Sequence, residues 1–213
     1  MSGIKDYIAL FDLDGVILDS EGDYTLFWDK MGEKYLDVKG FGITIKGQTL
    51  VKILGDNYRP EDHARITAQL MDYESKMPFG YIPGAKDFLD SLKREGVRMA
   101  VVTSSDKTKM SNVYRRHPEF NSLFDRILTS EDFAASKPSP DCYLKGMSAL
   151  GADAAHTVVF EDSISGLMAG RGSGATVVAL STTNPAEQVA EYADLVIPDF
   201  RGYKFSDFLG VKH

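Results

Sequence analysis

Two aspartates separated by one residue are the first feature of the chain that could do chemistry. Asp12 and Asp14 lie in the segment Phe11-Asp12-Leu13-Asp14-Gly15-Val16, directly after the apolar run 7–10. An apolar run ended by a glycine is typical of a buried strand that delivers its last residues to a sheet edge. Positions i and i+2 of a strand point to the same side, so both carboxylates can converge on one site. Their repulsion is costly unless a cation or a proton offsets it, so the pair by itself indicates either a metal-assisted site or a solvated Asp-rich turn.

Further polar side chains follow the later apolar runs of the chain. Thr103 to Asp106 follow one such run, Glu161 and Asp162 follow another, and Lys137 lies between them in Ala135-Ser136-Lys137-Pro138. In a parallel sheet, ligands bind at the carboxyl ends of the strands. Carboxylates suit a hard cation, and a transferring phosphoryl group needs donors and cations around its oxygens. One carboxylate can attack phosphorus and a second can act as general acid and base, so these residues indicate a phosphoaspartyl enzyme.

The elements that must position these residues alternate regularly after residue 80. Apolar runs predict strands at 99–102, 126–129, 157–160, 175–180 and 195–197, with helical periodicity at 85–95, 107–116, 139–150, 163–169 and 186–192. The helix at 139–150 is predicted to turn Tyr143, Leu144, Met147 and Leu150 inward. Strands that are apolar throughout and separated by amphipathic helices are typical of a parallel sheet covered on both faces. We therefore predict an α/β fold, a doubly wound parallel sheet of the Rossmann-like type.

Residues 16–80 interrupt this alternation, because they contain no convincing strand. One helical face is formed by Tyr24, Phe27, Trp28, Met31 and Tyr35. Pro60 and the acidic residues after it predict the start of another helix. We interpret Trp28 as a core residue of this block rather than a platform for substrate. The predicted division is an α/β core of residues 1–15 and 81–213, with a helical domain of residues 16–80 inserted after the first strand.

Composition and charge argue against several classes of partner. The 213 residues include 43% hydrophobic and 26% charged residues, and 31 acidic against 24 basic residues give a formal net charge of −7. An acidic balance disfavours nucleic acids and anionic membranes as partners. No run approaches the roughly 18 apolar residues of a membrane span, no signal peptide is recognised, and the single Cys142 suits a reducing compartment. We expect a cytoplasmic protein, a monomer or weak homo-oligomer, that acts on a small phosphorylated metabolite.

Four segments of the chain together resemble the motifs of the haloacid dehalogenase superfamily, in its β-phosphoglucomutase-like and phosphoglycolate-phosphatase-like branch. The segments are Phe11 to Val16 with Asp19-Ser20-Glu21; Val102-Thr103-Ser104-Ser105; Ser136-Lys137-Pro138-Ser139-Pro140; and Phe160-Glu161-Asp162-Ser163-Ile164-Ser165-Gly166. Each segment alone is a weak signal, but all four occur in the same order and span essentially the whole chain. The resemblance implies a Rossmann-like core, a small all-helical cap inserted after the first strand, and Mg²⁺ as cofactor.

The resemblance also implies a role for each catalytic residue. Asp12 would be the nucleophile and a Mg²⁺ ligand, and Asp14 the general acid and base that also ligates the metal through its carbonyl oxygen. Thr103 and the amide of Ser104 would hold the transferring phosphoryl group. Lys137 would neutralise this group and steady Asp12.

The remaining assignments concern the metal and the substrate. By the same resemblance, Asp162 would ligate Mg²⁺ directly. Glu161 would bind the metal through water or contact the residues that ligate it. The stretch 45–49 resembles the specificity loop of the family's cap, so Lys46 or Gln48 could reach the substrate.

The residues and the resemblance predict a Mg²⁺-dependent phosphatase for a small phosphorylated metabolite of the sugar phosphate type. The dehalogenases of the superfamily lack the second aspartate, so Asp14 favours phosphoryl transfer over cleavage of a carbon–halogen bond. A β-phosphoglucomutase is the alternative, although the basic residues that would grip its second phosphate have only Arg65 and Lys76 as candidates. A remote alternative is a non-enzymatic phosphoacceptor module of the receiver type, which would lack the helical insert.

Overall fold

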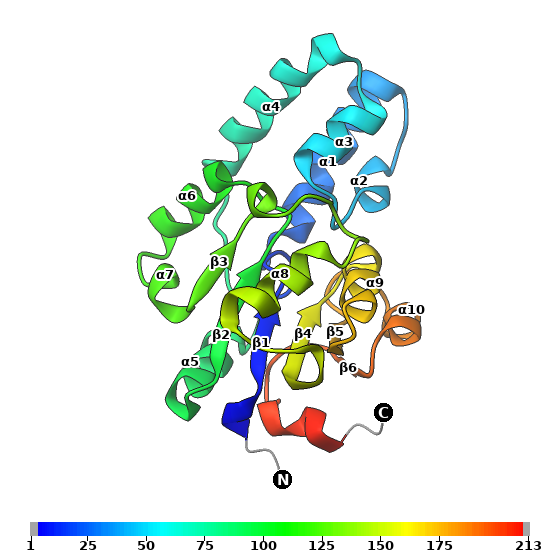
Figure 1. Ribbon diagram of the computed structural model, residues 1–213. Helices are drawn as coiled ribbons and strands as arrows, with labels where there is room; N and C mark the ends of the chain where they lie inside the picture. The colour runs from blue at the N-terminus through cyan, green and yellow to red at the C-terminus, as the bar shows by residue number, and fades with distance from the viewer. Residues whose placement is uncertain (1–3, 211–213) are drawn as a thin grey trace.

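Residues 4–210 of the chain are described by the computed structural model. Within them, six parallel strands form one sheet in the order β3-β2-β1-β4-β5-β6 (Figure 1). The strands are β1 (Ile8–Phe11), β2 (Arg98–Val102), β3 (Arg126–Leu128), β4 (Thr157–Glu161), β5 (Thr176–Leu180) and β6 (Leu195–Ile197). The central strand β1 pairs with β2 on one side and with β4 on the other, so the strand order reverses there. The predicted doubly wound α/β fold is confirmed, and its switch point lies at the end of β1, directly before Asp12.

The sheet is buried on both faces because alternate side chains of each strand point to opposite sides. Ala9 and Phe11 pack on the face covered by α5 (Ala85–Glu95), α6 (Lys107–Arg116) and α7 (Phe120–Leu123). Ile8 and Leu10 pack on the opposite face, against α8 (Asp141–Leu150). Helices α9 (Ile164–Gly172) and α10 (Ala186–Val189) lie against β5. The 3₁₀ helices are Ile4–Asp6, Ser130–Asp132, Ala154–His156, Ala190–Tyr192 and Phe205–Gly210.

The predicted inward face of α8 is wrong at one residue. Tyr143, Met147 and Leu150 are buried, but Leu144 is 47% exposed. The three buried residues share one stripe of the helix, whereas Leu144 is rotated by about 100° from Tyr143. The apolar type of Leu144 therefore did not show on which side of the helix it lies.

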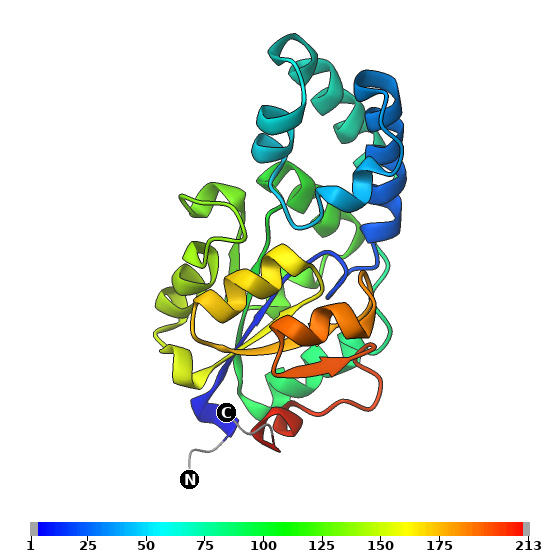
Figure 2. The same ribbon diagram turned by 90° about the vertical axis from the view of Figure 1, so that its right-hand side faces the viewer.

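Helices α1 to α4 gather beyond the carboxyl ends of the strands, at the end of the molecule opposite the N-terminus (Figures 1 and 2). They are α1 (Glu21–Leu36), α2 (Phe41–Thr44), α3 (Leu50–Asn57) and α4 (Pro60–Glu74). Their shared apolar core is separate from those of the sheet and includes Phe27, Trp28, Ile53 and Ile66. As predicted, Trp28 is a core residue of this block, but it also lines the cavity at the strand ends, so the prediction that it is no platform for substrate stays a prediction.

The two chain segments that connect these helices to the sheet run side by side. The Ile82 amide donates to the Ile17 carbonyl at 2.9 Å, and the Asp19 amide donates to the Gly80 carbonyl at 2.7 Å. Ile17 and Leu18 are fully buried in the core beside the sheet. The helical segment is thus anchored at both of its ends close to the end of β1, where Asp12 and Asp14 lie.

Candidate active site

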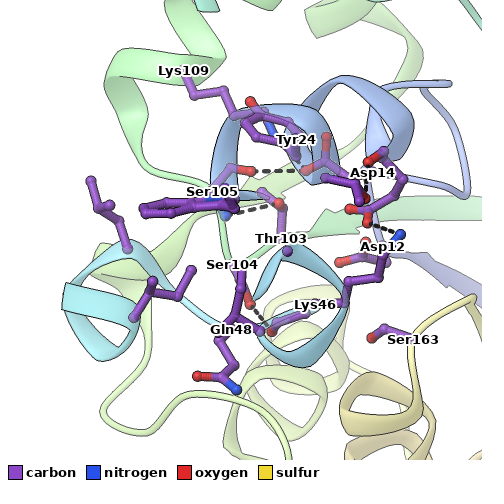
Figure 3. A pocket seen from close by; sticks show the side chains of 18 of the residues that line it. Asp12, Asp14, Tyr24, Lys46, Gln48, Thr103, Ser104, Ser105, Lys109 and Ser163 are labelled. Atoms are coloured by element: carbon purple, nitrogen blue, oxygen red, sulfur yellow. Dashed lines mark hydrogen bonds and ion pairs between the residues drawn. The ribbon is translucent and has the colours of Figure 1, made fainter. Parts of the chain in front are cut away.

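A cavity lies between the strand ends and the helical segment, and most of the predicted site residues line it (Figure 3). Those on the cavity are Asp12, Asp14, Thr103, Ser104, Asp162, Lys46 and Gln48. Figure 3 shows Lys46 extending toward Asp12, whereas the Gln48 amide lies on the far side of the cavity from both aspartates. The remaining two predicted residues, Lys137 and Glu161, are fully buried behind Asp12. The fold therefore brings all of the predicted strand-end residues together.

Three carboxylates form a compact acidic group beside the cavity. Oxygen atoms of Asp12, Glu161 and Asp162 lie within 4.8 Å of one another. The pKa of Asp12 is raised to about 8, mainly by burial; Lys137 opposes this rise, and Glu161 and Asp14 add to it. Burial and the nearby carboxylates of Glu21 and Glu161 also raise the pKa of Asp162 well above its usual range. Carboxylates crowded in this way favour a bound proton or a cation.

The same group passes a chemical test for a divalent metal. Asp162 Oδ2 is buried and makes no well-formed hydrogen bond within the described part of the chain. A buried carboxylate oxygen without a donor is costly, and a hard cation with oxygen ligands removes that cost. The donors present therefore fit a divalent cation held by Asp12 and Asp162.

Lys137 supplies the positive charge on the protein side of this group. Its ammonium donates to Asp12 Oδ1 and to Glu161 Oε1, each at 2.5 Å. Burial by itself would lower the pKa of Lys137, but the two carboxylates hold it well above its usual value. Lys137 therefore remains protonated and fixes the orientation of the Asp12 carboxylate.

Glu161 is held by protein donors on both of its oxygens. Oε1 accepts from Lys137 and from the Tyr143 hydroxyl at 2.9 Å. Oε2 accepts from the Asp162 amide at 2.9 Å, and from the Ser163 amide and hydroxyl at 3.0 and 3.1 Å. These contacts make Glu161 a support for Lys137, while its contact with a metal through water stays a prediction. The sequence identified Tyr143 only as an apolar core residue, because nothing in its spacing reveals where its hydroxyl lies.

Gly166 gives a first testable prediction, because α9 passes close to Glu161 at this residue. A Cβ atom at Gly166 would lie 1.7 Å from Glu161 Oε1, whereas one at Gly172, on the same helix, would lie 3.5 Å from Pro140. We expect Gly166→Ala to displace Glu161 from Lys137, to lower the free energy of unfolding by about 1–3 kcal/mol and to reduce turnover. Gly172→Ala is the matched control and should be neutral or stabilising by up to about 1 kcal/mol. Chemical denaturation and activity assays of both variants test this, and equal behaviour of the two would contradict it.

Asp14 is held from three sides, by Ser20, Ser105 and Lys109. The Ser20 hydroxyl donates to Oδ1, and the Ser105 hydroxyl donates to Oδ2 at 3.1 Å. The Lys109 ammonium donates to Oδ2 at 2.5 Å and lies 4.1 Å from the ring centroid of Tyr24 on α1. Asp14 is therefore fixed at the junction of α1, α6 and the sheet.

Lys109 is a functional residue that sequence reasoning missed altogether. It is buried in the first turn of α6, where its backbone amide donates to the capping residue Asp106 at 2.8 Å. A cation in the first turn is unfavourable for the helix dipole. That conflict is the signal in the sequence that could have identified Lys109 as a residue with a partner elsewhere.

The stretch 45–49 of the helical segment is hydrogen-bonded to three parts of the core: the segment after β2, the segment before α8, and the first turn of α9. The Ser104 hydroxyl donates to the Gly47 carbonyl at 3.0 Å, and the Ser165 hydroxyl donates to the Lys46 carbonyl at 3.1 Å. The Thr49 amide donates to the Ser136 hydroxyl at 3.3 Å. These contacts close the cavity on the side of the phosphate-binding candidates Thr103 and Ser104.

An α/β enzyme of the phosphatase or phosphomutase class is the kind of protein that this sheet and this cavity define. More particularly, the chain belongs to the family of haloacid dehalogenase-like hydrolases, whose family model matches residues 9–180. The resemblance inferred from the four motifs is therefore confirmed. None of the helices between residues 4 and 210 combines the length and apolarity that a bilayer crossing requires.

Known relatives include both kinds of enzyme. The chain is 29% identical to validoxylamine A 7′-phosphate phosphatase of Streptomyces hygroscopicus subsp. limoneus, over 90% of this chain and 93% of the relative. It is 28% identical to the bifunctional riboflavin kinase/FMN phosphatase of Arabidopsis thaliana, over 89% of this chain and about half (52%) of that longer relative. The structure of β-phosphoglucomutase from Clostridium difficile matches with a TM-score of 0.78 at 21% identity, over 95% of each chain. That last likeness concerns the fold alone.

Proposed function

We propose that the protein is a Mg²⁺-dependent phosphatase that hydrolyses a small phosphomonoester, of the sugar phosphate type, through an aspartyl-phosphate on Asp12. The observation that carries the proposal is the arrangement around Asp12, which lines the cavity while Lys137 holds one of its oxygens from behind. Asp14 lines the same cavity and is held separately by Ser20, Ser105 and Lys109. Two carboxylates with different partners suit two different roles.

Asp12 and Asp14 divide the proposed reaction between them. A carboxylate oxygen of Asp12 attacks phosphorus, the bond from phosphorus to the ester oxygen breaks, and Asp14 gives its proton to the leaving alkoxide. A water molecule then attacks the phosphorus of the acyl phosphate, and Asp14 accepts a proton from that water. The bond from phosphorus to the Asp12 oxygen breaks, which releases inorganic phosphate and restores the Asp12 carboxylate. Thr103, the Ser104 amide and Lys137 stabilise the charge on the phosphoryl oxygens.

Asp12, Asp162 and the carbonyl oxygen of Asp14 are the residues that we propose to hold Mg²⁺. When bound, the cation offsets the repulsion of the carboxylates and draws charge from the phosphoryl oxygens. The chain itself contributes the crowded carboxylates of Asp12, Glu161 and Asp162, which the fold holds next to the Lys137 ammonium. We propose that the helical domain of residues 16–80 acts as a cap that closes the cavity, with Lys46 facing the substrate.

A phosphomutase is the second candidate, and the contacts of the stretch 45–49 favour it. Those hydrogen bonds close one side of the cavity, and exclusion of water protects an aspartyl-phosphate from hydrolysis. A β-phosphoglucomutase would convert β-glucose 1-phosphate to glucose 6-phosphate in the presence of glucose 1,6-bisphosphate. Formation of glucose 6-phosphate well above the release of phosphate would replace the phosphatase proposal with this one.

The phosphatase proposal is tested by assaying phosphate release from a panel of phosphorylated metabolites, with Mg²⁺ and with EDTA. We expect release from at least one monophosphate with Mg²⁺ and its loss with EDTA. No release from any member of a broad panel would contradict the proposal.

Metal binding gives a second prediction, in the stability of the protein. Without a divalent cation the folded protein holds a proton on Asp12 up to about pH 8, the raised pKa of this carboxyl, whereas the unfolded chain releases the proton near the ordinary pKa of 3.8. Because the folded state binds more protons across this window, the free energy of unfolding contributed by Asp12 falls as the pH rises through it. Mg²⁺ removes this penalty, so it should raise the melting temperature more at about pH 8 than at about pH 5.

Thermal unfolding with and without Mg²⁺ at the two pH values measures this difference. Asp12→Asn is the control, because it removes the titrating group and should reduce the pH dependence of the Mg²⁺ effect. A Mg²⁺ effect of equal size at both pH values, or none at either, would contradict the proposed metal site.

A further inference from the structure

The lining of the cavity carries an excess of negative charge. Besides Asp12, Asp14 and Asp162, the cavity is lined by the carboxylates of Glu21, Glu74 and Asp106. Glu21 comes from the start of α1, Glu74 from the end of α4, and Asp106 from the residue that caps α6. These three carboxylates thus surround the cavity from three different elements.

The lysines that line the described cavity are both paired with carboxylates. Lys46 lies 2.9 Å from Glu21 Oε2, and Lys109 lies 2.5 Å from Asp14 Oδ2. Within residues 4–210, no arginine or histidine lines this cavity. Every cation in the described lining of the cavity is therefore already paired with a carboxylate, and none is left for a second anionic group of the substrate.

The basic residues that the sequence offered for a second phosphate lie elsewhere. Arg65 and Lys76 have side chains that are 67% and 70% exposed, and they pair with Asp62 and Asp72 on the outside of the helical segment. Neither residue lines the cavity. Their predicted role in gripping a second phosphate has no support in the structure.

Much of the remaining lining is apolar, although neutral polar residues such as Thr25 and Gln48 also take part in it. The apolar part includes Trp28, Ile45, Leu50, Ile53 and Leu70, which belong to the core of the helical segment. An apolar wall with a few carboxylates suits the carbon face and the hydroxyl groups of a neutral polyol, because carboxylates accept hydrogen bonds from hydroxyls. The same surroundings would repel a phosphate, which carries about −1.5 to −2 charges at pH 7.

We infer that the cavity selects phosphomonoesters with an uncharged, hydroxyl-bearing leaving group and rejects bisphosphates of the same sugars. This inference rests on the proposed function, and it deepens it by naming the substrate class and the groups that exclude others. Glu74 and Asp106 act as an electrostatic barrier to a second anion. The selection also separates the two candidate functions, because a mutase of this kind must bind a sugar bisphosphate.

Binding to the inert variant Asp12→Asn tests the inference without depending on turnover. The probes are two matched pairs, glucose 6-phosphate with glucose 1,6-bisphosphate and fructose 6-phosphate with fructose 1,6-bisphosphate, titrated by calorimetry in the presence of Mg²⁺. We expect at least one monophosphate to bind about tenfold or more tightly than its bisphosphate, which is the effect of a like charge a few ångströms away in a partly screened site. A bisphosphate that binds as tightly as its monophosphate in both pairs, or a failure of both monophosphates to bind, would overturn the inference.

Neutralising variants in the same background identify the groups responsible. Glu74→Gln keeps an oxygen that can accept from Tyr24, and Asp106→Asn keeps a residue that can cap α6. Each should reduce the preference for the monophosphate several-fold. Glu95→Gln is the matched control, because Glu95 is exposed at the end of α5, away from the cavity, and its loss should leave the preference unchanged. An effect of Glu95→Gln as large as the other two would overturn the role of Glu74 and Asp106.

Lys109→Met gives an independent check on the pairing with Asp14. If Lys109 is paired with Asp14 and does not contact the second phosphate, the variant should change the preference for the monophosphate by no more than several-fold, which is the effect of one charge in the lining. A selective loss of bisphosphate binding well beyond that range would show that Lys109 receives the second phosphate, and the inference would be wrong. Failure of the phosphatase proposal is distinguishable, because the wild-type protein would then release no phosphate while the binding preference persisted.

Discussion

Replacement of Asp12 by asparagine should lower phosphate release by at least about 10⁴-fold while the protein remains folded. An amide oxygen is a far weaker nucleophile than a carboxylate, and the reaction as proposed has no other group in place of Asp12. Asparagine has almost the same volume, so the packing between β1 and β4 should be preserved. Loss of a charge that burial and the neighbouring carboxylates penalise should leave the metal-free melting temperature equal or higher.

Steady-state assays on the best substrate and thermal unfolding measure the two parts of this result. Asp19→Asn is the matched control, since Asp19 is exposed, lies close in sequence and does not line the cavity. It should retain nearly full activity. Wild-type activity in Asp12→Asn would exclude Asp12 as the nucleophile.

Replacement of Lys137 by methionine should damage both activity and stability. Methionine fills a similar space but leaves Asp12 and Glu161 buried without their shared positive charge. Removing one partner of a buried ion pair costs about 3–5 kcal/mol of unfolding free energy, because the charge left behind has no compensation. The phosphoryl group would also lose a neutralising cation, so turnover should fall together with stability.

A second substitution separates the electrostatic cause from simple loss of packing. Glu161→Gln in the Lys137→Met background removes the stranded charge of Glu161 and should restore part of the lost stability. Lys30→Met is the control, because Lys30 is exposed on α1, and it should change the unfolding free energy by no more than about 0.5 kcal/mol. Chemical denaturation of these three variants and of Glu161→Gln alone measures these changes. A double variant that is less stable than Lys137→Met by the full cost of Glu161→Gln alone would contradict the charge argument.

The core of the site could be predicted from sequence because the chemistry lies where strands end. Asp12, Thr103 and Asp162 each follow an apolar run, and a parallel sheet brings the carboxyl ends of its strands to one edge. The pattern of apolar runs therefore predicted the doubly wound parallel sheet and the meeting of these residues, but not the order of the strands. The order of the strands places β1 between β2 and β4, which puts Asp12 at the centre.

The contacts that hold the site could not be predicted in the same way. The bonds from Lys109 to Asp14 and from Tyr143 to Glu161 depend on how α6 and α8 pack on the sheet, which apolar periodicity does not specify. The same is true of Gly166, whose lack of a side chain makes room for Glu161. Leu144 shows that residue type can also predict burial wrongly, because this leucine is apolar but exposed.

The aspartyl-phosphate on Asp12 is the central claim, and trapping it is the most direct measurement. Asp14→Asn should allow phosphorylation by acetyl phosphate, whose leaving group needs no proton, but should slow the attack of water on the intermediate. Borohydride reduction of the acyl phosphate, followed by peptide mass mapping, locates the modified residue. We predict conversion of Asp12 to homoserine, dependent on acetyl phosphate and absent in a variant that also carries Asp12→Asn. Phosphorylation at another residue, or an unmodified Asp12 in an enzyme that turns over, would contradict the mechanism.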